Sequence, residues 1–292
     1  MTSRKPAAQS AAGLFAGIHV DELLAAALAE DLDKAGDVTS QATIPEDVEA
    51  VANVVARAPG CIAGLGPALR VFELLDASVA TAALVADGTV VDANTVLASV
   101  KGPARAILAG ERVALNLLGH LSGVATATRR LVDRVEGTGA TILDTRKTTP
   151  LLRALEKMAV RAGGGRNHRM GLYDAVLIKD NHVQSVGTVA EAVKRARKNV
   201  GRKMHVEVEI DRVADLESAI KAGADIVMLD NMSPAQMRKA VALAAGRCLL
   251  EASGGITLAN VLRVAETGVD FISVGWITHS APSLDVALDF EA

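Results

Sequence analysis

The chain has 292 residues, half of them hydrophobic, with 31 Lys or Arg against 34 Asp or Glu and a formal net charge of −3. This length can form one large domain or two modest ones, with a substantial core. The near-neutral charge and the presence of only one Trp, one Tyr and four Phe argue against nucleic acid as the main partner.

Residues 1–18 lack the apolar stretch of a signal peptide, and no run in the sequence approaches the length of a membrane span. We expect a disordered extension there and no membrane partner. Cys61 and Cys248 lie far apart in apolar runs without metal-ligand spacing. We therefore expect buried free thiols and a reducing, cytoplasmic compartment.

Residues 19–125 are expected to form an N-terminal α+β domain that includes the start of a linking helix. An amphipathic helix is predicted over 19–31, with acidic residues in its first turn. The segment 36–40 (GDVTS) breaks this helix, either as a loop with a polar role or as a simple turn. The other elements predicted here are strands over 48–63, 80–91 and 95–100 and a helix over 67–75.

A long helix is predicted over 106–135, with a kink near Gly119 or Gly123. Its apolar residues recur at helical spacing and form one stripe. Glu111 and Arg112 lie near its start. His120 lies within the helix, and a single histidine in such a place is more often structural than functional, so we assign it a structural role.

Residues 126–292 are expected to form an α/β barrel domain, because apolar strands alternate with helices of about ten to fourteen residues. The strands are ATILDT, AVLIKD, HVEVEI, DIVMLD, CLLEAS and DFISVG. Such alternation predicts a parallel sheet covered on both faces. A polar residue or glycine ends each strand, which favours an incomplete TIM-like barrel with one catalytic mouth. A doubly wound open sheet is the alternative.

Positive charge is concentrated between Arg146 and His182. This stretch contains eight Lys or Arg and three acidic residues, which gives a formal charge of +5. Cations gathered at strand ends suit a polyanionic small molecule, because they offset the desolvation of carboxylates and phosphates. Within this stretch a helix is predicted over 151–161. Its basic residues recur every fourth position, so we interpret them as a solvated outer face: Arg153, Lys157 and Arg161.

Four other cations lie at strand exits or beside a glycine run, and these are assigned to the site: Arg146, Lys147, Arg169 and Lys179. Two acids, Glu209 and Asp230, end neighbouring strands. Carboxylates in that position can hold Mg²⁺ or ribose hydroxyls, or they can form ion pairs with the basic cluster. Glu207, two residues earlier on the same face, is a rival for the role of Glu209.

The segment SGGI, which contains Ser253, Gly254 and Gly255, is predicted to cradle a phosphate together with the start of a helix at Thr257. Two glycines after a strand are also common without any ligand. The next strand ends at Val274, Gly275 and Trp276, which could close over the same phosphate. His279 suits a phosphate contact or a capped helix equally well.

No Ser-His-Asp, Cys-His or zinc-spaced set occurs, so the predicted site is electrostatic and lacks an evident nucleophile. This suits phosphoribosyl transfer, in which C1′ of the ribose becomes oxocarbenium-like as pyrophosphate leaves. Such a reaction needs positioning and neutralisation of the leaving group.

The motifs TRKTTP, GGGRNHRMGLYD and LIKDNH, in this order, together resemble the signature of the quinolinate phosphoribosyltransferase family. GERVALNLLGHLSGVAT upstream and EASGGI downstream extend the resemblance from about Asp21 to the C-terminus. The resemblance implies an N-terminal α/β domain followed by an incomplete α/β barrel. It also implies a role in NAD biosynthesis, in which quinolinate and phosphoribosyl pyrophosphate give nicotinate mononucleotide, pyrophosphate and carbon dioxide.

The resemblance also implies roles for individual residues. The quinolinate carboxylates would be bound by Arg146, Arg169 and Lys179, with His168 beside them. Lys147 would meet the phosphates of the ribose donor, while Glu209 and Asp230 would hold its ribose hydroxyls and a Mg²⁺ cofactor. The 5′-phosphate would contact Ser253, Gly254, Gly255 and Gly275. Thr145 is a further expected substrate-binding residue, as are Val274, Trp276 and His279. Lys147, Glu209 and Asp230 are the expected catalytic residues.

In this family Arg112 reaches the site of a partner subunit, so a homodimer is implied. One departure from the family pattern is Leu151, which stands where TRKTTP is usually followed by glycine. Three alternatives remain: a paralogue encoded with molybdenum-transport genes, a nicotinate phosphoribosyltransferase, and a non-catalytic anion-binding barrel.

Overall fold

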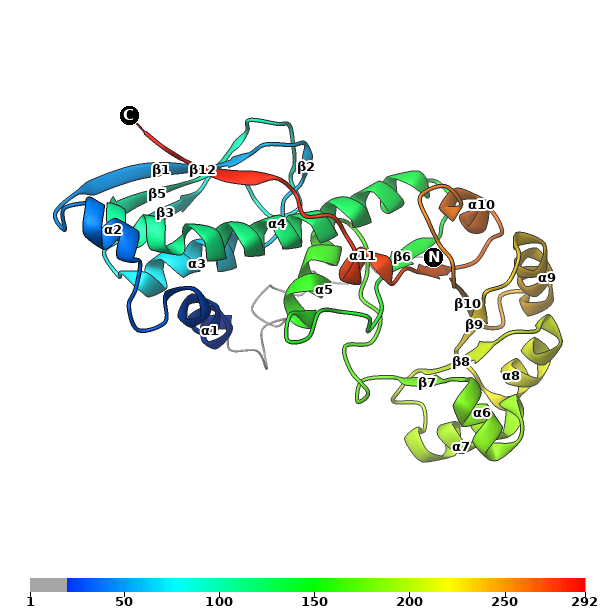
Figure 1. Cartoon of the computed structure of the whole chain (residues 1–292). Helices are drawn as coiled ribbons and strands as arrows, with labels where there is room; N and C mark the ends of the chain where they lie inside the picture. Colours follow the sequence, from blue (N-terminus) through cyan, green and yellow to red (C-terminus); the bar gives the residue numbers. More distant parts are fainter. Residues whose placement is uncertain (1–19, 292) are drawn as a thin grey trace. The chain divides into compact units, whose positions relative to one another are not determined.

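The computed structural model describes residues 20–291 (Figure 1). The extension expected over 1–18 and the first residue of the predicted N-terminal helix lie outside the described residues. The chain divides into two compact units. One contains residues up to 125 together with 154–162 and 282–292, and the other contains 126–153 and 163–281. The segments 154–162 and 282–292 thus lie in the first unit, whereas the sequence prediction placed them in the barrel domain.

The first unit is built on antiparallel strands: β1 (Glu49–Ala56), β2 (Gly60–Cys61), β3 (Ala80–Ala83), β4 (Val90–Val91), β5 (Val96–Pro103) and β12 (Val286–Phe290). Four of them form a sheet in the order β12-β1-β5-β3, and β2 pairs with β4. Val54 in β1 lies opposite Ala98 on one side and Leu288 on the other. This pairing explains why the C-terminal segment belongs with the first unit.

The helices of the first unit are α1 (Val20–Leu32), α2 (Val38–Thr43), α3 (Leu65–Leu75) and the first part of α4 (Ala104–Arg134). They pack on the sheet around a core that includes Val54, Phe72 and Leu118. The loop predicted over 36–40 is instead the beginning of α2. The Asp37 carboxylate accepts hydrogen bonds from the backbone N–H groups of Thr39 (3.0 Å) and Ser40 (3.1 Å) and so caps the helix.

Helix α4 is continuous through Gly119 and Gly123, the two positions at which a kink was predicted. These glycines make room for the chain that leads into β12. A Cβ at position 119 would lie 2.9 Å from the carbonyl oxygen of Leu284, and one at 123 would lie 2.2 Å from that of Pro282. The Leu284 N–H also donates to the Gly119 carbonyl at 2.9 Å. The glycines therefore serve close packing.

The second unit contains six parallel strands: β6 (Thr141–Leu143), β7 (Val176–Ile178), β8 (Val206–Ile210), β9 (Ile226–Asp230), β10 (Leu249–Ser253) and β11 (Phe271–Ser273). All six were predicted. Their order in the sheet is β6-β11-β10-β9-β8-β7, so the first strand pairs with the last. That closure is typical of a barrel and not of a doubly wound sheet. The sheet remains open between β6 and β7, and the predicted incomplete barrel is confirmed.

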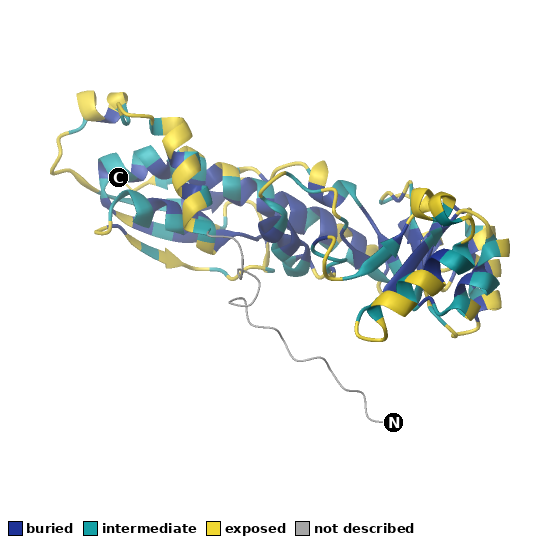
Figure 2. Cartoon of the chain, turned by 90° about the horizontal axis from the view of Figure 1, so that it is seen from below, coloured by how far each residue is buried: buried dark blue, intermediate teal, exposed yellow. Residues whose placement is uncertain are grey.

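Helices of the second unit follow the strands: α6 (Asp180–Val186), α7 (Val189–Val200), α8 (Leu216–Ala222), preceded by the short 3-10 turn η2 (Val213–Asp215), α9 (Pro234–Ala244), α10 (Val261–Ala265) and α11 (Trp276–His279). Figure 2 shows buried strands beneath helices whose outer faces are exposed. Helix α9 begins with a capping box in which Ser233 and Gln236 exchange hydrogen bonds around Pro234. No helix among residues 20–291 combines the length and the apolar character needed to cross a membrane.

Helix α5 (Arg153–Ala162) corrects the prediction of a solvated basic face. Lys157 is completely buried, as are its neighbours Leu155 and Glu156. Four consecutive buried residues, 154–157, point in all directions around a helix, so α5 is covered on every side. The Lys157 side chain has an interaction partner in this interior.

The packing at Gly123 yields a stability prediction. Gly123→Ala places a methyl group against a backbone carbonyl and should lower the free energy of unfolding by about 1–3 kcal/mol. Gly66→Ala, at an exposed helical position with nothing within 4 Å of the added Cβ, is the control and should cause no loss. Urea unfolding followed by circular dichroism measures both. Equal stabilities of the two variants would contradict the packing role.

Candidate active site

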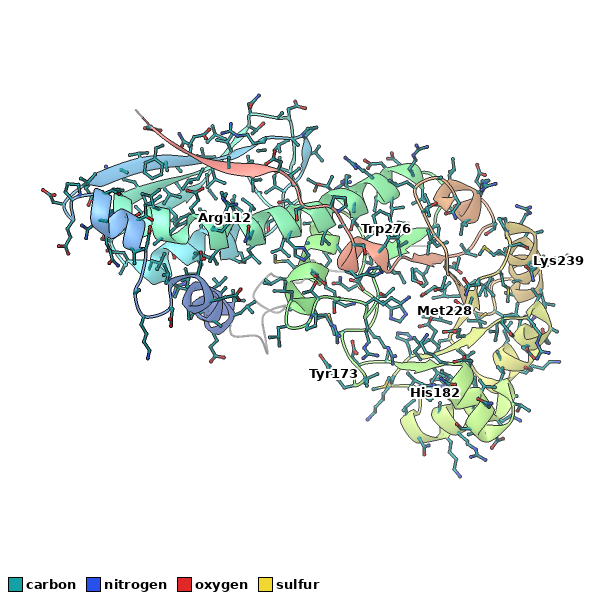
Figure 3. The ribbon with its side chains drawn as sticks, in the orientation of Figure 1. Arg112, Tyr173, His182, Met228, Lys239 and Trp276 are labelled. Carbon is teal, nitrogen blue, oxygen red and sulfur yellow. The ribbon has the colours of Figure 1, made fainter. Side chains whose placement is uncertain are left out.

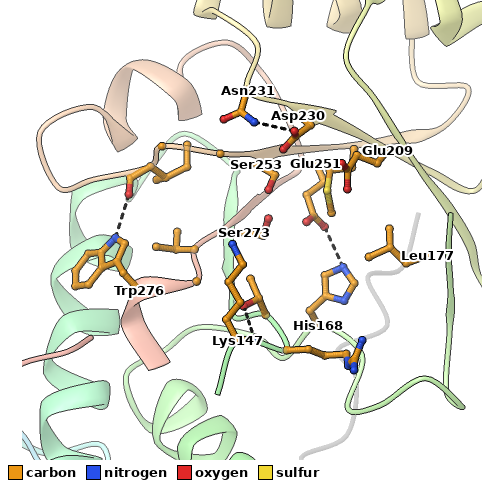
Figure 4. A pocket seen from close by; sticks show the side chains of 18 of the residues that line it. Lys147, His168, Leu177, Glu209, Asp230, Asn231, Glu251, Ser253, Ser273 and Trp276 are labelled. Atoms are coloured by element: carbon orange, nitrogen blue, oxygen red, sulfur yellow. Dashed lines mark hydrogen bonds and ion pairs between the residues drawn. The ribbon is translucent and has the colours of Figure 1, made fainter. Parts of the chain in front are cut away.

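The C-terminal ends of the six parallel strands surround a cavity of about 760 Å³ in the second unit (Figure 4). Strand-end residues and the loops that follow them line it: Thr145, Arg146, Lys147, His168, Arg169, Leu177, Lys179, Glu209, Met228, Asp230, Asn231, Glu251, Ser253, Gly254, Gly255, Ile256, Ser273, Val274, Gly275, Trp276 and His279. Because parallel strands end at the same edge, side chains far apart in sequence meet there.

The cationic part of the cavity is held by backbone contacts. The hydroxyl oxygen of Thr145 accepts from the Lys147 N–H (3.0 Å), and the Thr278 hydroxyl donates to the Lys147 carbonyl (2.7 Å). Burial and the neighbouring Arg146 guanidinium lower the pKa of Arg169, while Glu207 opposes this shift. Two guanidinium groups that repel one another favour an anion bound between them.

Glu209 and Asp230 face the same cavity. The Lys179 Nζ lies 2.7 Å from Glu209 Oε2, and the Asn231 amide donates to Asp230 Oδ2 at 2.7 Å. Their carboxylate oxygens are the ligand type that Mg²⁺ prefers, so the pair is chemically suited to that ion. Glu207 is buried at 4% exposure and is not among the lining residues, which leaves Glu209 as the accessible acid of this strand.

The loop after β10 contains two consecutive glycines in the left-handed backbone conformation. Gly254 and Gly255 have φ values of 94° and 62°, and a Cβ at 254 would lie 2.1 Å from Asn231 Oδ1. Only glycine is accommodated there. The indole N–H of Trp276 donates to the Ile256 carbonyl at 3.0 Å and ties this loop to the one after β11.

The helix predicted to begin at Thr257 begins instead at Val261. The Asn260 side chain accepts from the Thr257 N–H and donates to the Gly255 carbonyl, both at 2.8 Å, and so closes a turn ahead of the helix. The helix start therefore lies four residues beyond its predicted position.

A polar cluster at the cavity consists of His168 and Glu251, which line it, and of Glu207, which is buried behind them. His168 Nε2 is 3.0 Å from Glu207 Oε2 and 3.7 Å from Glu251 Oε2. Burial, followed by the charge of Glu207, raises the pKa of Glu251 to about 8, and His168 acts in the opposite direction. The pKa of Glu251 is thus held well above that of an ordinary carboxyl group. Asp144 anchors the same region, because its carboxylate accepts from the His168 N–H at 2.9 Å.

Comparison with known proteins agrees with this geometry. The family model described as "Quinolinate phosphoribosyl transferase, C-terminal domain" matches residues 124–289, and its N-terminal counterpart matches 37–122. The chain is 46% identical over 254 residues to a probable nicotinate-nucleotide pyrophosphorylase [carboxylating] of Bacillus subtilis, covering 87% of this chain and 88% of that protein.

The corresponding enzyme of Mycobacterium leprae is 44% identical over 268 residues, which cover 90% of this chain and 94% of that one. The solved structure of the nicotinate-nucleotide pyrophosphorylase from Francisella tularensis superposes with a TM-score of 0.89 at 42% identity, over 93% of this chain and 96% of the other.

The chain belongs to the quinolinate phosphoribosyltransferase family.

Every site residue predicted from the sequence lines this cavity of the quinolinate phosphoribosyltransferase fold, except Arg112. Arg112 lies on α4 in the first unit with its side chain 65% exposed, and it is not a lining residue (Figure 3). The lining residues that sequence reasoning missed are Leu177, Met228, Asn231, Glu251, Ile256 and Ser273. Strand alternation could have found four of these residues, because each lies two positions before a strand-end residue and on the same face of its strand. The four are Leu177, Met228, Glu251 and Ser273.

Leu151, the departure from the family motif, adopts φ = 67° and is 79% exposed. This left-handed conformation is the one that glycine adopts readily. The turn after Pro150 therefore keeps a glycine-like backbone, and the bulky side chain points away from the interior.

The raised pKa of Glu251 predicts a pH dependence of stability. In the unfolded chain this group ionises above about 4.5, whereas in the folded protein it keeps its proton up to about 8. The folded state therefore binds the extra proton within this window, and the free energy of unfolding falls as pH rises, by at most about 1.4 kcal/mol per pH unit.

Glu251→Gln removes this titration, so its urea-unfolding free energy should fall less steeply than that of the unmodified protein between pH 5 and 8. Glu191→Gln, at an exposed ion pair with Arg195, is the control and should keep the original slope. Parallel slopes for Glu251→Gln and the unmodified protein would show that Glu251 is ionised throughout.

Proposed function

We propose that this chain is a quinolinate phosphoribosyltransferase of NAD biosynthesis, which converts quinolinate and phosphoribosyl pyrophosphate into nicotinate mononucleotide, pyrophosphate and carbon dioxide. The observation that carries the proposal is a single cavity that combines four cations, two accessible carboxylates and a glycine turn. The match of the chain to the models of both domains of the family supports the proposal, as do the names of its relatives.

Quinolinate has two adjacent carboxylates, and both charges need partners in a cavity that excludes water. Arg146, Arg169 and Lys179 supply three cations for them, with His168 next to Arg169. The repulsion between Arg146 and Arg169 supports this assignment, because a dianion placed between them lowers the electrostatic energy.

The ribose donor would occupy the opposite part of the cavity. Lys147 and Thr145 would meet its phosphates, and Glu209 and Asp230 would hold its ribose hydroxyls. Ser253, Gly254, Gly255 and Gly275 would bind the 5′-phosphate, with Val274, Trp276 and His279 around it. The positive φ values at 254 and 255 support this placement, because they free backbone N–H groups for an anion.

In the reaction, the pyridine nitrogen forms a bond to C1′ as the bond from C1′ to the pyrophosphate oxygen breaks. The bond between C2 and its carboxylate then breaks, carbon dioxide leaves, and the electron pair remains on C2 until a proton is added. The adjacent pyridinium nitrogen stabilises that carbanion. The protein contributes orientation of the two substrates and fixed charges around the developing ones.

Mg²⁺ is the proposed cofactor, held by Glu209 and Asp230. When bound, the ion would neutralise charge on the pyrophosphate. The carboxylates themselves orient the ribose hydroxyls and keep the local field negative near C1′, where positive charge develops. Lys179, which pairs with Glu209 at 2.7 Å, would exchange that contact for a substrate carboxylate.

Substrate choice tests the function directly. Purified protein with the ribose donor and Mg²⁺ should form nicotinate mononucleotide from quinolinate, with kcat/KM at least about tenfold above that for nicotinate, since nicotinate leaves a cation unpaired at roughly 1–3 kcal/mol. Arg146→Ala should raise KM for quinolinate far more than KM for the donor. Arg212→Ala, an exposed arginine outside the cavity, is the control.

Equal kcat/KM for the two pyridines would favour a nicotinate phosphoribosyltransferase. Donor binding measured by calorimetry without any product would favour a non-catalytic anion-binding barrel. If the folded protein converts neither quinolinate nor nicotinate, the result would favour the paralogue that is encoded with molybdenum-transport genes.

The metal role of Asp230 yields a further prediction. Asp230→Asn keeps the size of the side chain but removes its charge, and should lower kcat on the order of 10²-fold while weakening the Mg²⁺ dependence. Asp211→Asn, whose side chain is 84% exposed, is the matched control and should change neither. An unaltered Mg²⁺ titration in Asp230→Asn would return Asp230 to a structural role.

We also propose a homodimer in which Arg112 enters the site of the partner subunit. The exposure of the Arg112 side chain supports a role at an interface. Arg112→Ala and Lys147→Ala chains should each be nearly inactive, and mixing them should restore part of the activity through hybrid dimers. Hybrids that form without any recovery would place Arg112 outside the site.

A cytoplasmic location completes the proposal. Cys61 and Cys248 are both free thiols, which suits a reducing compartment. Cell fractionation that finds the protein outside the cytoplasm would contradict it.

A further inference from the structure

Glu207 and Glu251 have no part in the proposed reaction, and with His168 they form a cluster at the cavity that also contains the cations. Their ligand atoms lie within 4.8 Å of one another, and both glutamates are almost fully buried. As carboxylates, neither oxygen of Glu251 nor Oε1 of Glu207 accepts a hydrogen bond from the described residues. Two buried carboxylates this close are stable only if a cation or a proton lies between them.

The hydrogen bonds of His168 decide between a cation and a proton. Its Nδ1 accepts from the backbone N–H of Arg169 at 2.7 Å, so Nδ1 carries no proton. Nε2 must then carry the ring proton, which it donates to Glu207 Oε2 at 3.0 Å. A metal ion on Nε2 would leave the imidazole without any proton, in contrast to metal-bound histidines, whose other nitrogen donates. The geometry therefore favours a proton.

From this geometry we infer that Glu207 and Glu251 are positioning residues, which share one proton and hold His168 as its neutral Nε2–H tautomer, so that His168 fixes the Arg169 backbone at the quinolinate subsite. The inference rests on the proposed function for the identity of that subsite. Glu251 would donate its proton to Glu207, and the ionised Glu207 would accept from both Glu251 and His168. The raised pKa of Glu251 agrees with this order.

The chain of contacts continues into the cavity. The Asp144 carboxylate accepts from the His168 N–H at 2.9 Å, so the histidine is held at its backbone and at both ring nitrogens. The Arg169 guanidinium is then fixed by its Nη1 contact with the Ala175 carbonyl at 3.1 Å. With both ring nitrogens occupied, His168 acts through Arg169 and does not donate to the substrate itself.

The state of His168 can be observed in the full-length ¹⁵N-labelled protein by long-range ¹H–¹⁵N correlation of its imidazole nitrogens. The chain has six histidines, and His168→Gln identifies the signals by their loss. The expected result is an Nε2–H tautomer at pH 7, both in the unmodified protein and in Glu251→Gln. An Nδ1–H or doubly protonated ring, or one equivalent of metal found by elemental analysis, would overturn the inference.

Kinetics provide the second readout. Glu207→Gln should raise KM for quinolinate roughly tenfold or more while changing KM for the ribose donor less than about threefold. Glu251→Gln keeps a hydrogen-bond donor toward Glu207, whereas Glu251→Ala has none. KM for quinolinate should therefore rise less in Glu251→Gln than in Glu251→Ala. Glu191→Gln is the control for the Glu→Gln exchange. Equal changes in both KM values, or equal losses in the two Glu251 variants, would reduce the cluster to a structural role.

The two readouts separate this inference from the proposed function. The tautomer is measured without turnover, so a protein inactive on quinolinate would refute the function and leave the NMR result intact. If Glu207→Gln fails to fold, the tautomer in the unmodified protein and the comparison of Glu251→Gln with Glu251→Ala still test the inference.

Discussion

Two buried glutamates, Glu207 and Glu251, lie beside His168 at the cavity. A buried carboxylate is stable only when a proton, a cation or hydrogen bonds offset its desolvation. Here burial and the charge of Glu207 raise the pKa of Glu251, and Glu207 also opposes the lowering of the Arg169 pKa. The cations above the cluster are in turn close enough to repel one another. Anion binding at the mouth and acid burial below it are therefore parts of one electrostatic arrangement.

A site without a nucleophile depends on fixed positions, and the loops at the strand ends are joined by polar contacts across neighbouring strands. The Asn231 N–H donates to the Ser253 carbonyl at 2.9 Å, and its side chain lies where any Cβ at Gly254 would be. Trp276 binds the loop after β10, and Thr278 binds the loop that carries Lys147. These contacts join the loops to one another and to α11. They keep the charged groups in place before a substrate arrives.

The barrel strands and their polar ends could be predicted because both depend on local patterns, namely apolar runs and the residue that follows each run. Lys157 could not be placed, because its spacing on a helix says nothing about what surrounds that helix. Glu251 looked like an ordinary acid within a strand, although its alternation with Ser253 points it to the same face. β12 escaped prediction because its partner, β1, lies more than two hundred residues away in sequence. The start of α10 depends on a side-chain turn by Asn260, which also competes with helix formation.

The alternation of side chains along β8 links substrate specificity to the buried acid of the same strand. On β8, Glu209 reaches the cavity and Glu207 lies one layer deeper on the same face, so recognition and support come from one strand. Removing a cation such as Arg169 leaves the buried acid below it less compensated, and removing that acid leaves the cations to repel one another. A change from a dicarboxylate to a monocarboxylate substrate therefore requires coordinated substitutions in both layers. Single substitutions at the mouth would lower stability or affinity without transferring specificity.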